Sequence, residues 1–486
     1  MTTTTAPATT GTTTTAVTVT APATTGTTTT AVTVTAPATT GTTATTTAPA
    51  TTAAIAPVTT ATVTAPATAT TTTVPAPPAV LSAGVRVPLA DGGEAEYAAL
   101  DYAASAPALR QVWDDIAAYA PYYGSVHRGA GHLSLLSTRL FEESREAVAR
   151  FLGCRPGDQV VFTRSTTDSL NLLAAATPAG TRVFVFETEH HAALLPWRGR
   201  DVSFLPAPRS PEEAVRTTEQ ALRTAPPGPK LLCVTGASNV TGELWPVREL
   251  AAAAHRHGAR IVLDAAQLAP HRPVDIATLD VDWVAFSGHK LYAPFGSGVL
   301  AGRADWLAAA DPYLAGGGAS RTVSRRPDGG VAVEWHTDES RHEAGSPNVI
   351  GAYAIASACR TLTGAGFDRL VADEDHLLGR LRTGLDALPA VRTLSLFGPD
   401  APRVPVVSFT VEGWDSAEFA RTLSERYGIG VRSGLFCAHP LVRTLLGEEP
   451  ADCDGPLQAI RVSFGTGTPP GHIDRLLRAT AELTAG

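Results

Sequence analysis

The residue that organises the chemistry of this chain is Lys290, which follows closely on the short apolar run Val284–Phe286. A lysine at the end of a buried strand is partly removed from water, which favours the neutral amine that forms an imine with a carbonyl compound. Asp264 ends another apolar strand, Arg260–Leu263. A carboxylate there is costly to bury unless a cation meets it, and a protonated pyridine nitrogen would be such a cation. For Lys290 taken alone, a surface lysine in a loop is the alternative.

The segment after the expected strand Val160–Phe162 carries the residue types of an anion site. Ser165 or Thr166 can cap the helix that follows, so that free backbone N–H groups and the helix dipole point at a phosphate. His190 follows another buried strand, Arg182–Phe186, at the carboxyl end, where ligands gather in open α/β sheets. An imidazole there can stack on a flat cofactor ring, and a histidine with a structural role only is the alternative.

Two residues near the C-terminus add groups that could bind or attack a substrate. Arg461 lies on the otherwise apolar segment 459–464, and such an arginine can bind a carboxylate through two parallel hydrogen bonds. Cys437 lies in a glycine-containing loop with Arg432 and His439 nearby in sequence. A neighbouring cation favours the thiolate, which is the nucleophilic form of cysteine. A buried structural cysteine is the alternative.

The elements that must position these groups alternate between strands and helices. Strands are expected at residues 160–162, 182–186, 230–234, 260–263 and 284–286. Helices are expected at residues 113–119, 138–152, 246–257 and 350–362, and the glycine-rich segment 122–136 suits a loop at a site or an interface. This alternation is typical of a parallel, doubly wound sheet. From about Phe367 the pattern changes to that of a smaller α+β domain.

We expect four parts in the chain: a disordered Thr/Ala/Pro-rich tail at 1–80, an N-terminal segment at 81–110 that packs with the small domain, a large domain at 111–350 and a small domain at 351–486. The tail contains the same fifteen residues twice, at Thr12–Gly26 and Thr27–Gly41. Such a segment cannot bury enough apolar surface to offset its chain entropy. We interpret it as dispensable or as the product of a mis-assigned translation start, and a mucin-like stalk is the alternative.

Composition and charge exclude several classes of protein. The net charge of −8 and the absence of a basic stripe argue against nucleic acid as a partner. The sequence has no apolar run of about 20 residues for a membrane span, and no basic residue precedes an apolar run as in a secretory signal. Its five cysteines are scattered and lack CxxC spacing, which fits a reducing cytoplasm without disulfides or a metal site. Cys233 and Cys359 suit the core, whereas Cys453 is an exposed cysteine or a second redox thiol.

Eight segments, in this order, resemble the pyridoxal-phosphate enzymes of fold type I in the class V aminotransferase family, and within it the cysteine desulfurases and selenocysteine lyases. The segments are LDYAASAP, VHRG, TEHHAALLPW, SNVTG, DAAQ, SGHK, AGSPN and RSGLFCAHPL. The resemblance runs from about Leu100 to the C-terminus and leaves out the tail. It implies an α/β fold with a large, mostly parallel doubly wound sheet domain, a smaller α+β C-terminal domain, and pyridoxal 5′-phosphate as the cofactor.

The resemblance also implies a role for each matching residue. Lys290 would hold the cofactor as a Schiff base and move protons at Cα, and Asp264 would pair with the pyridine nitrogen. Other cofactor contacts would come from His190 on the ring, Asn239 and Gln267 at the phenolic oxygen, Thr166, Thr167, Ser287 and His289 at the phosphate, and Ser346 of the partner subunit in a homodimer. Arg461 and Arg432 would bind the substrate.

Cys437 matches the cysteine that, in a desulfurase, takes the sulfur of the substrate as a persulfide and leaves alanine as the other product. The resemblance therefore implies a homodimeric, cytoplasmic desulfurase that acts on L-cysteine or a related amino acid and passes sulfur to an acceptor protein. The chain departs from the family pattern at Leu435 and Phe436, where polar residues are usual. Ser433 and Ser346 replace the usual threonines but keep the hydroxyl group.

The apolar pair before Cys437 leaves the substrate and the sulfur acceptor open. One alternative is another class V reaction, such as that of an amino-acid lyase, transaminase or epimerase. A second is a sulfur-delivery or scaffold protein with little turnover. A third is a wall-associated protein displayed on the Thr/Pro-rich tail.

Overall fold

The computed structural model describes residues 77–447 and 458–485. The predicted tail, apart from residues 77–80, and Cys453 lie outside the described residues. Within these ranges, none of the helices has the length and apolar character that crossing a membrane requires.

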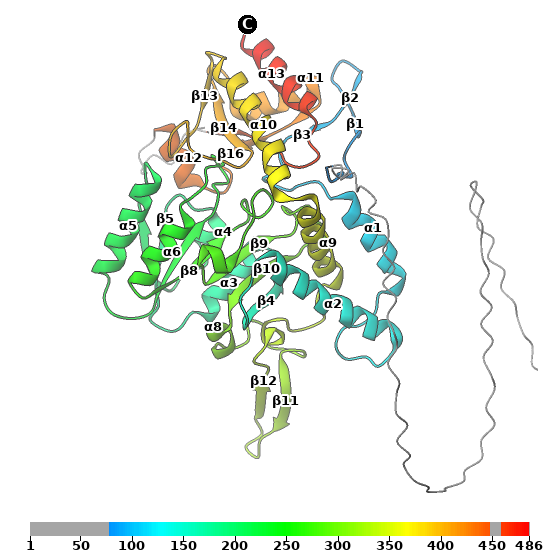
Figure 1. The fold of residues 1–486 in the computed structure, drawn as a ribbon, viewed down its shortest axis with the longest axis vertical. Coiled ribbons are helices and arrows are strands. Elements are labelled where there is room, and N and C mark those ends of the chain that lie inside the picture. Colours follow the sequence, from blue (N-terminus) through cyan, green and yellow to red (C-terminus); the bar gives the residue numbers. More distant parts are fainter. Residues whose placement is uncertain (1–76, 448–457, 486) are drawn as a thin grey trace, which may run out of the picture. The chain divides into compact units, whose positions relative to one another are not determined.

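A seven-stranded sheet forms the centre of the fold (Figure 1). Its strands lie in the order β4 (Asp158–Thr163), β10 (Gly298–Arg303), β9 (Trp283–Ser287), β8 (Ala259–Asp264), β7 (Lys230–Thr235), β5 (Arg182–Phe186) and β6 (Asp201–Leu205). β10 pairs antiparallel with both β4 and β9, and the other neighbouring strands pair in parallel. The predicted α/β fold with a large, mostly parallel sheet is confirmed.

The central strands are apolar on both faces because helices cover both faces of the sheet. Alternate side chains of a strand point to opposite faces, and in β5 Val183 and Val185 join one buried cluster while Phe184 and Phe186 join another. The helices of this region are α3 (Thr166–Ala176), α4 (His191–Leu194), α5 (Pro211–Thr224), α6 (Val247–Arg256), α7 (Ile276–Leu279) and α8 (Ala304–Ala309).

Three further helices flank the β4 side of the sheet in Figure 1: α1 (Arg110–Tyr119), α2 (His132–Phe151) and α9 (Val349–Ala365). α2 begins six residues before the predicted start at 138, so part of the expected loop at 122–136 is helical. The apolar pattern does not predict this start, because at the beginning of the helix Ser134 and Ser137 are buried while Leu133 and Leu135 are exposed. The helix buries small hydroxyl side chains close to Tyr119, whose hydroxyl group bonds Ser137.

A smaller antiparallel sheet follows, with its strands in the order β13 (Val391–Thr393), β14 (Val406–Val411), β17 (Ala459–Ser463) and β16 (Arg432–Gly434). Its helices are α10 (Phe367–Asp386), α11 (Ser416–Tyr427), α12 (His439–Leu446) and α13 (Pro470–Thr484). This mixture is the smaller α+β part that was predicted.

The N-terminal described segment contacts this small sheet region. It holds the short strands β1 (Arg86–Pro88), β2 (Glu94–Glu96) and β3 (Ala98–Ala99). β3 pairs in parallel with β15 (Ile429–Gly430). For the domain boundary we propose Gly366 rather than residue 351, because Ile355, Ala358 and Leu362 of α9 belong to the core of the large sheet.

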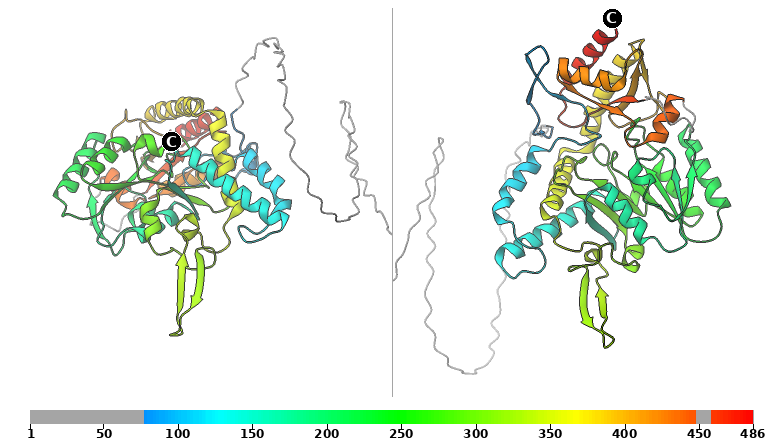
Figure 2. Two further views of the ribbon diagram at one scale, coloured as in Figure 1. Left: turned by 60° about the horizontal axis from the view of Figure 1, so that its bottom comes forward. Right: turned by 180° about the vertical axis from the view of Figure 1, so that it is seen from behind.

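A hairpin that the sequence did not suggest projects from the body of the molecule (Figure 2). It consists of β11 (Ser320–Arg325) and β12 (Val331–Trp335), joined by a short turn. Its apolar residues Val323 and Val331 are exposed.

Candidate active site

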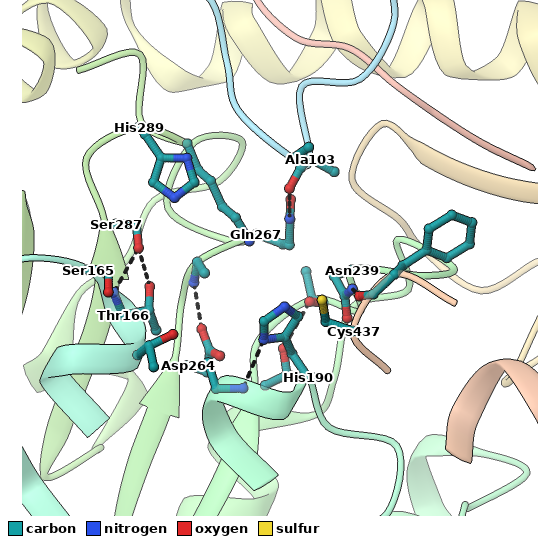
Figure 3. Close-up of a pocket in the computed structure, with 18 of the residues that line it drawn as sticks. Ala103, Ser165, Thr166, His190, Asn239, Asp264, Gln267, Ser287, His289 and Cys437 are labelled. Carbon is teal, nitrogen blue, oxygen red and sulfur yellow. Dashed lines mark hydrogen bonds between the residues drawn. The ribbon is translucent and has the colours of Figure 1, made fainter. Parts of the chain in front are cut away.

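A cavity of about 250 Å³ collects twelve of the predicted site residues (Figure 3). They are Thr166, Thr167, His190, Asn239, Asp264, Gln267, Ser287, His289, Lys290, Arg432, Cys437 and Arg461. Ser346 is the exception, since it lines a separate hollow together with Tyr313 and Asn348. In the described part of the chain, no group of three or more His, Cys, Asp and Glu side chains is arranged to hold a metal ion.

The parallel strands explain why residues far apart in sequence meet here. Asp264 is the last residue of β8, Ser287 is the last residue of β9, and His190 follows the end of β5. Neighbouring parallel strands end at the same edge of a sheet, which is where open α/β sheets bind ligands.

Lys290 lies on the turn that follows β9, and its backbone N–H points to the Ser287 carbonyl at 3.3 Å. Burial lowers the pKa of its amine to about 8, against the opposing effect of the Asp264 carboxylate. The positive charge of Arg461 acts in the same direction as burial. About a tenth of the amine is therefore neutral and nucleophilic at pH 7, far more than for a lysine with the ordinary pKa of 10.5.

Asp264 is buried, with an exposed fraction of 4%. Its Oδ1 accepts a hydrogen bond from the Ala266 backbone N–H at 2.9 Å. Burial raises the pKa of this carboxyl group, and the Ala266 hydrogen bond and the Lys290 charge oppose that rise. A carboxylate in this position is stabilised by a cation that enters the cavity.

The start of α3 forms a compact group of donors. Ser165 caps the helix, and its Oγ accepts a hydrogen bond from the Asp168 N–H at 3.3 Å. The Ser287 Oγ accepts from the Thr166 N–H at 2.7 Å and lies 2.8 Å from the Thr166 Oγ1. A β-carbon on Gly298 would lie 2.6 Å from the Ser165 Cα, so β10 can pass this close to the helix start only with glycine. Hydroxyl groups and a helix N-terminus together favour an anion.

His190 caps the start of α4. Its Nδ1 accepts a hydrogen bond from the Ala192 N–H at 3.0 Å, which assigns the ring proton to Nε2. Burial, followed by the charge of Lys290, lowers the pKa of His190 to about 3. The imidazole therefore offers a flat neutral face and one N–H donor.

The two side-chain amides of the cavity each donate one hydrogen bond to the protein. Asn239 Nδ2 donates to the Phe436 carbonyl at 2.8 Å, and Gln267 Nε2 donates to the Ala103 carbonyl at 2.8 Å (Figure 3). Each NH₂ group has a second hydrogen. The predicted contacts of both amides with a phenolic oxygen stay predictions.

Arg461 lies on β17 with an exposed fraction of 3%. Nη1 donates to the Asn239 carbonyl at 3.0 Å, and Nη2 forms an ion pair with Asp101 at 3.0 Å. The Nε–H has no hydrogen-bond partner among the described residues. A buried donor of this kind is costly unless a ligand completes it.

The sequence analysis did not single out Asp101 as a site residue. It is the second residue of LDYAASAP and is separated from Arg461 by 360 positions. No local pattern could have joined the two, because their contact depends on how the N-terminal segment lies along the small sheet.

Cys437 is the exposed cysteine among the four that the structure describes. Its carbonyl accepts a hydrogen bond from the His191 N–H at 2.8 Å. Of the two predicted neighbouring cations, Arg432 lines the same cavity. The His439 ring instead packs against the His191 ring, with the ring centroids 4.5 Å apart.

The fold is that of the class V aminotransferases. The profile of the family described as "Aminotransferase class-V" matches residues 98–476, and the chain belongs to this family. Within the family it is similar to cysteine desulfurases. A probable cysteine desulfurase of Vibrio cholerae is 35% identical over 392 residues, covering 78% of this chain and 92% of the relative. A cysteine desulfurase of Pectobacterium atrosepticum is 37% identical over 355 residues, covering 71% and 84%.

Solved structures agree with this placement. A cysteine desulfurase from Thermococcus onnurineus, solved in the apo form, matches with a TM-score of 0.71 and 32% identity, covering 80% of this chain and 95% of that one. A cysteine desulfurase from Escherichia coli, solved as an S-sulfonic acid, matches with a TM-score of 0.68 and 30% identity, again covering 80% and 95%.

Proposed function

We propose that this chain is a pyridoxal-phosphate-dependent cysteine desulfurase, which transfers the sulfur of L-cysteine to Cys437 and forms L-alanine. The observation that carries the proposal is an exposed thiol, Cys437, in the same cavity as Lys290 and Arg461. Relatives that are named cysteine desulfurases support it.

The residues of the cavity fit pyridoxal 5′-phosphate. The amine of Lys290 suits its aldehyde, the buried carboxylate of Asp264 suits its protonated pyridine nitrogen, and the neutral ring of His190 suits its flat face. The donors at the start of α3 suit its phosphate. When bound, the cofactor supplies an electron sink for the bonds at the substrate Cα. We assign Thr166, Thr167, Ser287 and His289 to the phosphate and Asn239 and Gln267 to the phenolic oxygen.

The chain's own residues bind the substrate and move its protons. We assign the α-carboxylate to Arg461, whose Nε–H lacks a hydrogen-bond partner in the described residues, and Arg432 adds a second positive charge at the same wall. Lys290 takes and returns the proton at Cα, since its pKa of about 8 allows both protonation states near neutral pH.

Cys437 receives the sulfur. Its thiolate attacks the substrate sulfur, an S–S bond forms, and the Cβ–S bond of the substrate breaks. The electron pair of the broken bond stays on the carbon and takes up a proton, so that L-cysteine and the enzyme thiol become L-alanine and an enzyme persulfide. A second thiol, which we assign to an acceptor protein, then removes the outer sulfur.

The test is alanine release from L-cysteine by the holoenzyme and its Cys437→Ala variant. We expect the variant to keep the visible absorption of the cofactor and to lose sulfur release, and mass spectrometry to find one added sulfur on Cys437 of the wild type. Cys154→Ala is the matched control, because Cys154 lies outside the cavity. Unchanged sulfur release in Cys437→Ala would exclude the persulfide step. A panel of other amino acids, scored for ammonia and keto acid, distinguishes a lyase, transaminase or epimerase.

We also propose a homodimer in which Ser346 reaches the phosphate site of the partner. Ser346 lies in a hollow with Asn348, whose side chain bonds the carbonyl of the exposed Phe295. The Phe295 ring stacks on the exposed Trp113 with the ring centroids 5.9 Å apart. Neighbouring exposed apolar side chains often mark an interface. Sedimentation of the wild type and of Trp113→Glu tests the dimer, and the cofactor affinity of Ser346→Ala tests the contribution of the serine. A monomeric wild type would exclude both.

We propose a cytoplasmic location. The four cysteines in the described residues are all free, which supports a reducing compartment. Cell fractionation tests this, and recovery in the cell-wall fraction would favour display on the tail instead.

A further inference from the structure

The turn that carries Cys437 has an unusual backbone. Phe436 and Cys437 have φ values of 51° and 54°, and the Ala438 N–H donates to the Leu435 carbonyl at 2.9 Å. A four-residue turn with positive φ at both central residues strongly prefers asparagine and glycine there. Neither central residue here is of that kind, so contacts outside the turn must hold it.

The carbonyl groups of both central residues of this turn receive hydrogen bonds from the region of the large sheet. Asn239 Nδ2 donates to the Phe436 carbonyl at 2.8 Å (Figure 3), and the His191 backbone N–H donates to the Cys437 carbonyl at 2.8 Å. The backbone is therefore fixed at the thiol-bearing residue and at the residue before it.

The Phe436 side chain joins this turn to the carboxylate-binding residue. The guanidinium carbon of Arg461 lies 4.9 Å from the centroid of the Phe436 ring, and Phe436 is only 7% exposed. Arg461 also donates to the Asn239 carbonyl at 3.0 Å. The three residues form a closed circuit, in which the guanidinium bonds the Asn239 carbonyl, the Asn239 amide bonds the Phe436 carbonyl, and the Phe436 ring faces the guanidinium.

We propose that Phe436 is a positioning residue that couples Arg461 to the Cys437 turn and makes the site select ligands with an α-carboxylate. An aromatic face attracts a guanidinium and restricts the orientation of its plane. With one face against Phe436 and Nη2 paired with Asp101, Arg461 directs its remaining donors at a carboxylate. A ligand that engages Arg461 is thereby aligned with the turn that presents the thiol. The inference rests on the proposed function, which assigns the carboxylate to Arg461.

The test uses the holoenzyme at equal cofactor content and follows alkylation of Cys437 by iodoacetamide at the peptide level. Protection by L-alanine, which has an α-carboxylate, is compared with protection by ethylamine, which has none. Phe436→Leu keeps an apolar side chain but removes the aromatic face. We expect it to raise the half-protecting concentration of L-alanine about tenfold, the size of effect that a cation–π contact can have, and to leave that of ethylamine unchanged.

Two controls separate this from a general loosening of the small sheet region. Phe436→Tyr keeps an aromatic face, and we expect both ligands to protect its Cys437 as they do in the wild type. Phe419→Leu makes the same substitution at a fully buried phenylalanine outside the cavity. We expect the half-protecting concentrations of both ligands to stay unchanged in this variant.

The proposal would be overturned if Phe436→Leu lost protection by L-alanine and by ethylamine to the same extent, or lost no protection by L-alanine. It would also be overturned if the two ligands protected the wild type equally. If Phe436→Leu does not fold, Phe436→Met gives the same comparison. Failure of the proposed function is recognised separately, because protection by L-alanine requires no turnover of L-cysteine.

Discussion

Asp101 and Arg461 form an ion pair with an N–O distance of 3.0 Å, although 360 positions separate them in the sequence. The guanidinium is buried, and the Asp101 side chain keeps an exposed fraction of 28%. The pair therefore links the N-terminal segment to the central part of the small sheet, at the wall of the active site.

Removal of the Asp101 carboxylate should destabilise the protein. Loss of one partner of a buried ion pair costs several kcal/mol, but partial exposure screens this one, so we expect Asp101→Ala to lower the free energy of unfolding by about 2 kcal/mol. Urea unfolding of the apoprotein measures it. Glu94→Ala is the control, because it breaks an exposed ion pair with Arg86 and should have little effect. Equal effects of the two substitutions would contradict the prediction.

Cofactor capture by the apoprotein should depend on pH through Lys290. The pKa of its amine is lowered from 10.5 to about 8, so the reactive neutral form is present above about pH 8 and is lost as the pH falls through this value. The rate of the absorbance change after adding pyridoxal 5′-phosphate should therefore rise with a midpoint near pH 8.

Two variants should move this midpoint in opposite directions. The charge of Asp264 raises the pKa of Lys290 and the charge of Arg461 lowers it. Asp264→Asn should therefore lower the midpoint, and Arg461→Met should raise it. Shifts in the same direction would show that the two charges do not act on Lys290 as the structure indicates.

His190 should stay neutral through the whole physiological pH range. Burial lowers its pKa to about 3, and its Nδ1 accepts the Ala192 N–H. In ¹⁵N spectra of histidine-labelled protein, we expect the resonances that disappear in His190→Gln to be those of a neutral Nε2–H ring from pH 5 to 8. A titration near pH 6.5, the ordinary value for histidine, would contradict this assignment.

The described thiols should differ strongly in reactivity. Cys437 is exposed, whereas burial raises the pKa of Cys154 to about 12. Cys233 and Cys359 lie inside the core. Limited iodoacetamide treatment, followed by mass spectrometry of the peptides, should find Cys437 modified well before the other three. Faster modification of Cys154 would show that its local structure opens.

The large sheet could be predicted because its signals are local. Parallel strands buried on both faces appear as short apolar runs, and β5 has the predicted bounds, 182–186. The antiparallel strand β10 and the β11–β12 hairpin were not predicted. β10 begins with Gly298 and ends with Arg303, and most residues of β11 are exposed. Neither segment therefore shows a clear apolar period.

The cavity residues could be predicted where each one marks the end of an element. Asp264 and Ser287 end strands, and Thr166 begins a helix. The contacts that join the two parts of the site could not be predicted. Asp101 contacts Arg461 across 360 positions of the sequence, and Asn239 contacts Phe436 across 197 positions. Such contacts are a property of the folded chain, and no spacing in the sequence encodes them.

The position of β17 in the chain has a consequence for how the enzyme is made. In the described residues, Arg461 lies on β17, which comes after the elements that carry Thr166 to Lys290 and before the helix α13. Domains generally fold in order during synthesis, the N-terminal parts first. We therefore expect the elements that carry Thr166 to Lys290 to form before Arg461, to which we assign the substrate carboxylate, has been translated. A chain that is cut short after α12 would keep Lys290 and lack Arg461, and we expect such a product to be unable to select its substrate.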